Sequence, residues 1–267
     1  MTRRPPCVAG RFYPGEADSL KKAVDSFLIK GIDAQEAVSI IAPHAGYIYS
    51  GAVAGAVYSA AKIPDTVVLI GPNHTGLGEQ VSIMPEGAWE IPTGTLGINA
   101  ELSDLILENG LFTSDASAHL MEHSLEVQLP FIKALNDKAA IVPITVMHAD
   151  ASECAALGEA LAGAVKKFGK PVLIVVSSDM NHYEPDARTR EKDRLALDRV
   201  LQLDADGLLR VTKGKNITMC GVVPAAIAIN ASRRLGAKEA LLVKYATSGE
   251  TSGDLHQVVG YAGVIIK

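Results

Sequence analysis

Three stretches of the sequence decide the fold, namely SIIAPHAGY at 39–47, VLIGPNHTG at 68–76 and LIVVSSDMNHY at 173–183. Each joins a short apolar run, rich in β-branched residues, to a turn that carries a histidine. Such a run predicts a strand that is buried on both faces, as in a parallel sheet covered by helices. We therefore expect the polar turns to lie at the carboxyl ends of strands in one sheet.

The rest of the chain continues this alternation of strands and helices. It predicts an α/β fold, a single three-layer α/β/α domain over residues 1–267 with a central mixed, mainly parallel sheet. Glycines within 76–97 predict an added antiparallel hairpin. The predicted strands are 37–41, 66–70, 139–146, 171–176, 240–246 and 258–266, and the predicted helices lie near 17–29, 51–62, 99–109, 121–135, 152–168, 186–202 and 222–235.

The composition excludes several classes of protein. Of the 267 residues, 48% are apolar and three are cysteines, and the net charge is −5. Three cysteines without CxxC spacing predict no disulfide framework or zinc knuckle. No apolar run approaches the roughly 20 residues that span a bilayer, and no basic block marks a nucleic-acid partner. We expect a reduced, cytoplasmic protein with neither a membrane nor a nucleic-acid partner.

The turns after the three strands carry residues suited to chemistry. His44 follows the first strand, His74 follows the second, and Asp179 and His182 follow the third. In open α/β sheets, ligands bind in the crevice beyond the carboxyl ends of the strands. A single histidine is more often an ordinary hydrogen-bonded residue, but its recurrence on three strands favours a functional cluster.

A fourth segment, TMCGVVPAAIAINA at 218–231, contributes Cys220. This cysteine directly precedes a helix predicted to begin near Val222, with Pro224 in its first turn. A helix N-terminus stabilises a thiolate, so we expect a lowered pKa and a role as nucleophile or metal ligand. The alternative is a small buried apolar residue.

A fifth segment, AHLMEHSLEVQLPF at 118–131, places His119, His123 and Glu126 on one side of a predicted helix. The spacing is not HExxH, which argues against a zinc protease. We predict that His123 and Glu126 lie outside the metal ligands and orient a ligand or relay a proton. An amphipathic helix with a solvated face explains the spacing equally well.

Seven motifs occur in one order and resemble the Memo family, the protein B of the AmmeMemoRadiSam system, from residue 9 to the C-terminus. They are AGRFYPG (9–15), APHAGYIYSG (42–51), GPNHTG (71–76), EHSLEVQLPF (122–131), SSDMNHY (177–183), MCGVVP (219–224) and the closing YATSGETSGD (245–254) with VVGYAGV (258–264).

The resemblance implies a fold shared with class III extradiol, LigB-type non-haem iron dioxygenases. It implies metal ligands at His44, His74 and Cys220, with Asp179 and His182 beside the metal. It also implies iron or copper binding and redox activity, signalling through phosphopeptide contacts in animals, and the radical-SAM and AMMECR-like proteins of the same system as partners. Extradiol chemistry is not inherited directly, because Cys220 stands where the dioxygenases have a carboxylate.

Three functional hypotheses follow. The first is a metal-dependent redox protein that holds Fe(II), with copper or zinc as alternatives because a thiolate is a soft ligand. In it His182 acts as acid or base, and Asp179 is a further ligand or orients a histidine. The second is metal-free catalysis in which Cys220 is the nucleophile and His182 the base. The third is a binding module that recognises a peptide or small molecule without turnover.

Overall fold

The computed structural model describes residues 2–267, whose centre is a mixed sheet. Four parallel strands form its middle in the order β2-β9-β3-β8. Antiparallel strands β12 and β4 flank them, on the β2 and β8 sides respectively. The predicted α/β fold is confirmed, and one further parallel pair, β4 with β7, lies at the edge beyond β8. The bounds are β2 (Ser39–Ala42), β3 (Thr66–Pro72), β4 (Val81–Ile83), β7 (Thr113–Ser114), β8 (Ala140–Val146), β9 (Leu173–Ser177), β10 (His182–Glu184), β11 (Ala240–Thr247) and β12 (Val258–Ile266).

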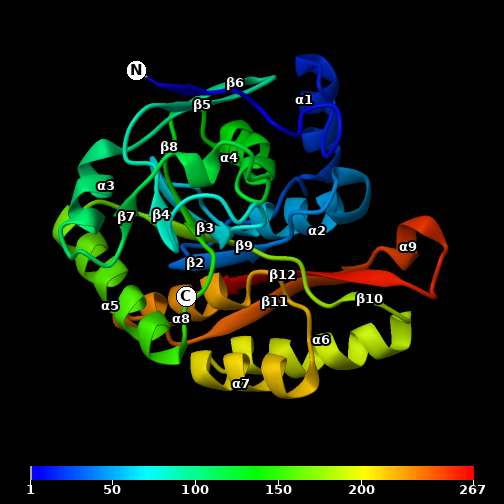
Figure 1. Ribbon diagram of the computed structural model, residues 1–267. Coiled ribbons are helices and arrows are strands. Elements are labelled where there is room, and N and C mark those ends of the chain that lie inside the picture. Colours follow the sequence, from blue (N-terminus) through cyan, green and yellow to red (C-terminus); the bar gives the residue numbers. More distant parts are fainter. Residues whose placement is uncertain (1) are drawn as a thin grey trace.

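Helices cover both faces of this sheet (Figure 1). Side chains alternate along a strand, so Ile40 packs with the core on one face and Ile41 with the core on the other. One face holds α1 (Ala17–Phe27), α2 (Tyr47–Ala60) and α4 (Leu129–Leu135). The other holds α3 (Ala100–Leu107), α5 (Ala151–Phe168), α6 (Asp186–Leu201), α7 (Ala205–Lys215) and α8 (Val222–Arg234).

A smaller sheet packs beside the first helical layer. Its strands β5 (Ala88–Ile91) and β6 (Gly94–Gly97) form an antiparallel hairpin within the glycine-rich region where one was predicted. Strand β1 (Arg3–Arg4) pairs in parallel with β5, so the N-terminal segment crosses to this sheet. This crossing brings the first residues of the chain close to the segment around residues 119–126.

The predicted helix at 121–135 is wrong over its first half. Residues before Leu129 form two 3₁₀ turns, Ser117–His119 and Glu126–Gln128, and α4 begins only at Leu129. Pro130 has no amide hydrogen and fits the first turn of a helix, where none is needed. His119, His123 and Glu126 therefore do not share a helical face. The sequence prediction also missed α7 and the short α9 (Gly249–Ser252).

None of the helices within residues 2–267 is long and apolar enough to cross a membrane.

Candidate metal centre

The carboxyl ends of the parallel strands converge on one pocket of about 600 Å³. His44, His74 and Asp179 each follow the last residue of their strand by two positions. Because these strands are parallel and adjacent, equal offsets bring the three side chains to the same edge of the sheet. The predicted convergence is therefore present. The residues that line the pocket include His44, His74, His123, Asp179, His182 and Cys220, with Phe12, Ala45, Tyr183 and Val259 among the walls.

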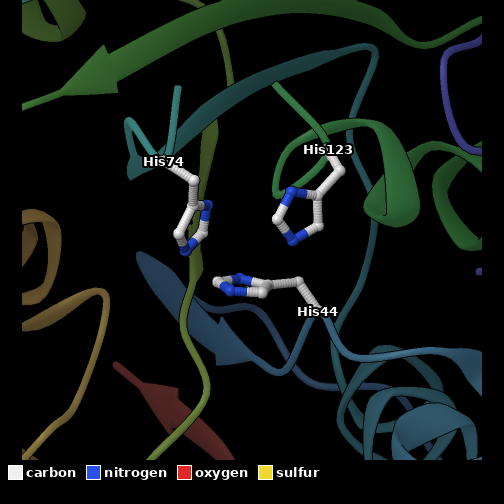
Figure 2. Close-up of side chains that lie close together, drawn as sticks. All are labelled: His44, His74 and His123. Atoms are coloured by element: carbon white, nitrogen blue, oxygen red, sulfur yellow. The ribbon is translucent and has the colours of Figure 1, made fainter. Parts of the chain in front are cut away.

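Three histidines form a cluster that could hold a metal ion. One ring nitrogen each of His44, His74 and His123 lies within 4.8 Å of the other two. Figure 2 shows the rings of His74 and His123 side by side and the ring of His44 facing both. The first two are stacked with their centres 4.6 Å apart, and each meets the ring of His44 edge-to-face. His123, which was predicted to lie outside the ligands, thus joins the two histidines of the predicted set. Cys220 adjoins the cluster, with its Sγ 3.2 Å from Nε2 of His44.

Hydrogen bonds fix the tautomer of His44. Its Nδ1 lies 3.0 Å from Oγ of Ser177. That hydroxyl donates its single hydrogen to the carbonyl of Ser124 at 2.6 Å and accepts from the side-chain Nε2 of Gln128 at 2.8 Å. Nδ1 of His44 must therefore donate, which leaves the lone pair of Nε2 facing the pocket. Burial, with His74 and His123 nearby, lowers the pKa of His44 well below its usual value, so the ring is neutral.

Glu122 orients His74, and the sequence reasoning missed it. Its carboxylate accepts from the backbone amide of His74 at 2.5 Å, from Nδ1 of His74 at 2.9 Å and from the amide of Ser124 at 2.9 Å. Burial alone would raise the pKa of Glu122, but these contacts outweigh it and lower the pKa to about 2. The arrangement is that of a carboxylate fixing a metal-binding histidine. The only signal in the sequence was a glutamate next to His123.

Asp179 and His182 lie beside the cluster. The carboxylate of Asp179 accepts from the backbone amide of His44 at 2.8 Å, and burial raises its pKa to about 7. Nδ1 of His182 donates to the carbonyl of Thr218 at 2.8 Å, so Nε2 carries the lone pair. Burial also lowers the pKa of His182. The pocket is therefore lined by a carboxyl group with a pKa near neutral, that of Asp179, and by the imidazole of His182, whose pKa is lowered.

Tyr183, on the rim of the pocket, has an unusual backbone. Its φ is 61°, a value that bulky residues rarely adopt, and its side chain is 72% exposed. The pairing of β10 with β12 shifts register between His182 and Glu184. Bulges next to active sites commonly re-aim a side chain, and local strain persists where the surroundings enforce it. Tyr183 is thus a candidate for ligand contact.

Glu126 does not enter the pocket, contrary to the predicted relay role. Both its oxygens are occupied, by Arg4, by the backbone amides of Cys7 and Val8, and by the hydroxyl of Tyr13. The relay role was predicted on the basis of a helix that Glu126 would share with His123. That helix is absent, because these long-range donors hold the chain around Glu126 in a different conformation. Glu126 is a buried anchor between distant parts of the chain.

The pKa of Cys220 shifts in the direction opposite to the prediction. Cys220 does precede the first turn of α8, whose N-cap is Gly221. Burial, followed by the charge of Asp179, nevertheless raises the pKa of the thiol, although the amide of Asp179 points at its sulfur at 3.2 Å. The expectation of a lowered pKa at the helix N-terminus is therefore wrong for the metal-free protein, because desolvation of the thiolate outweighs the helix dipole.

At pH 7, iodoacetamide is expected to alkylate Cys220 of the metal-free protein more slowly than it alkylates glutathione, because the thiolate is the reactive form. A time course read by mass spectrometry of the peptide that contains Cys220 measures this rate. The same protein unfolded in urea serves as the control and should react as an ordinary thiol. A folded rate above that of glutathione would show that the thiolate is stabilised after all.

Comparisons with known proteins agree with the motifs. Residues 4–265 match a family model described as Memo-like protein. A protein of Desulfurococcus amylolyticus described as a MEMO1 family protein is 42% identical over an alignment that covers 99% of each chain. A protein of Aquifex aeolicus with the same description is 43% identical over an alignment that again covers 99% of each chain.

Proposed function

The chain belongs to the Memo family, and from that premise we propose that it is a metal-dependent redox protein that binds Fe(II), with copper as the alternative metal. The observation that carries the proposal is the convergence of His44, His74 and His123, whose ring nitrogens lie within 4.8 Å of one another. Ser177 and Glu122 fix the orientation of two of these rings. Such outer contacts are typical of histidines that bind metals.

The donor set fits the proposed metals. We assign His44, His74 and Cys220 as ligands and add His123 as a further nitrogen donor. Imidazole suits iron, copper and zinc, and a thiolate favours the softer members of this group. Cys220 lies beside the free nitrogen of His44, and its proton must leave when a metal binds. Metal binding would therefore overcome the burial that keeps this thiol protonated.

The protein's own groups supply proton transfer and orientation in this proposal. A bound iron or copper ion would provide one-electron chemistry. His182 is neutral and holds its Nδ1 hydrogen on Thr218, so its Nε2 can accept a proton from a molecule in the pocket. Asp179, with a pKa of about 7, can hold or release a proton and orients the backbone at His44.

Metal-free catalysis with Cys220 as the nucleophile is less well supported by the same pocket. His182 was predicted as its base, whereas the imidazole next to Cys220 is that of His44, whose Nε2 lies 3.2 Å from the sulfur. His44 is buried and Cys220 is half-buried, however, and their pKa shifts favour the neutral thiol beside a neutral imidazole over the thiolate–imidazolium pair. These shifts therefore favour a Cys220 thiol that loses its proton only when a cation binds.

Anaerobic loading with Fe(II) or Cu(I), followed by desalting and elemental analysis, tests the proposal. We expect about one metal ion per wild-type chain and loss of the metal in His44→Ala, since one of only three or four donors disappears. His148→Ala is the matched control, because His148 lines a different cavity.

Loading with Co(II) adds a second measurement. We expect a sulfur-to-cobalt charge-transfer band in the wild type that is absent in Cys220→Ala. A wild-type protein that retains neither Fe(II) nor Cu(I) would overturn the proposal, and binding of a peptide by that metal-free pocket would favour a binding module instead.

A further inference from the structure

We propose that the buried Arg4–Glu126 ion pair is a positioning device for the candidate metal centre. It joins the N-terminal strap, defined as residues 4–13, to the site loop, defined as residues 119–126. The site loop carries Glu122 and His123, and the ion pair holds these two residues in position relative to His74. This inference rests on the proposed metal-binding function and assigns a role to residues outside the pocket.

Arg4 reaches three acceptors on the site loop. Its Nε donates to the carbonyl of His119 at 2.6 Å, one Nη to the carbonyl of Glu122 at 2.7 Å, and the other to the carboxylate of Glu126 at 2.6 Å. The guanidinium also lies 4.0 Å from the centre of the Trp89 ring. The side chains of Arg4 and Glu126 are fully buried. The rigid fork of arginine is suited to holding several acceptors in a fixed geometry.

Glu126 completes the connection from the other side. Besides Arg4, its oxygens accept from the backbone amides of Cys7 at 2.8 Å and Val8 at 3.0 Å and from the hydroxyl of Tyr13 at 2.7 Å. Every one of these donors belongs to the N-terminal strap. The pair therefore fixes the strap and the site loop relative to each other at several points.

The site loop depends on these contacts because it has no helix of its own. Arg4 donates hydrogen bonds to the carbonyl of His119, the last residue of the first 3₁₀ turn, and to that of Glu122, which lies between the two turns. On the pocket side, Glu122 binds both the backbone and the ring of His74. Phe12 of the strap packs against the ring of His123, with centres 4.7 Å apart. A shift of the site loop would therefore move His123, a proposed ligand, and Glu122, the carboxylate that orients His74.

A contribution to stability does not by itself explain why a charged pair is buried at this place. Burying two charges costs desolvation that their attraction often only offsets, and apolar side chains of similar size frequently serve as well. Removing one charge, by contrast, leaves the other buried without a partner. A double replacement can therefore separate fold stability from placement of the site loop.

The experiment compares Arg4→Met with the double variant Arg4→Met/Glu126→Leu, using Co(II) as the probe. We expect the single variant to unfold at a lower denaturant concentration. The double variant should recover part of that loss, because no charge then stays buried without a partner, although the backbone amides of Cys7 and Val8 lose an acceptor. The double variant should still bind Co(II) about 10–100-fold more weakly than the wild type, the usual effect of removing outer contacts of a metal site. Arg3→Met/Glu90→Gln, an exposed pair next along the chain, is the matched control and should bind as the wild type does.

A double variant that recovers both stability and Co(II) affinity would overturn the inference, because the pair would then be only structural. If the double variant does not fold, Arg4→Lys replaces it. Lysine keeps the positive charge but cannot donate to the three acceptors in the fixed geometry of the guanidinium. Weakened Co(II) binding is therefore expected, and wild-type affinity would again overturn the inference.

A second readout does not depend on metal. The Nδ1 hydrogen of His74, bonded to Glu122, should give a slowly exchanging imidazole NMR signal in the metal-free wild type. We expect this signal to shift or broaden in the double variant, and an unchanged signal would overturn the inference. If the wild type binds no metal, the proposed function fails, while this signal still decides whether the pair positions the site loop.

Discussion

Replacing Glu122 by alanine is expected to lower the free energy of unfolding by about 3–5 kcal/mol, because three donors would lose a buried acceptor. These donors are the backbone amide and Nδ1 of His74 and the amide of Ser124. The same variant should bind Fe(II) or Co(II) about 10–100-fold more weakly, since His74 would lose the group that selects its tautomer. Denaturant unfolding and metal titration measure the two effects separately.

Glu122→Gln is the matched control for shape. Glutamine keeps the size of the side chain and one acceptor oxygen, but its amide group would face one of the donors that the carboxylate now accepts. We expect an effect on stability smaller than that of Glu122→Ala and a clear loss of metal affinity. Wild-type metal affinity in both variants would show that Glu122 does not orient a ligand.

Acid is expected to destabilise the protein through the same carboxylate. The pKa of Glu122 is about 2 in the folded chain, below the roughly 4.3 of a glutamate in an unfolded chain. Between these values the folded state binds fewer protons, so stability that is present above pH of about 4.3 is lost as the pH falls toward 2. From Glu122 alone the loss is on the order of 3 kcal/mol.

Unfolding free energies measured from pH 6 to pH 2 on the wild type and on Glu122→Gln test this. The glutamine side chain does not titrate, so the difference between the two curves should be steepest in that window and flat above it. Parallel curves would mean that Glu122 is not held ionised by His74 and Ser124. Glu126 also has a lowered pKa, and its contribution is common to both proteins.

Local sequence predicted most of the fold and part of the site. Apolar runs of five to eight residues were sufficient for the strands of the middle of the sheet, because a strand buried on both faces needs such a run. Each of His44, His74 and Asp179 follows its parallel strand by two positions, which placed all three at one edge of the sheet. Local sequence failed at residues 121–128, where helical spacing predicted a helix that the structure does not have.

That failure has a long-range cause. The conformation of the site loop depends on Arg4, which is 122 positions from Glu126, and on His74, which is 48 positions from Glu122. A helical pattern records only neighbours within about two turns of the chain. Neither the burial of Glu126 nor the role of Glu122 could be deduced from that local information.

The sequence by itself determined the α/β class, the family, and the arrival of histidines and an aspartate at the ends of parallel strands, because each of these depends on local periodicity or on ordered motifs. Tertiary structure alone decided that His123 faces His44 and His74, that Glu122 fixes a ring, and that Cys220 is a protonated thiol without metal. Desolvation and hydrogen bonding depend on which distant groups surround a side chain, and only the folded chain brings those groups together.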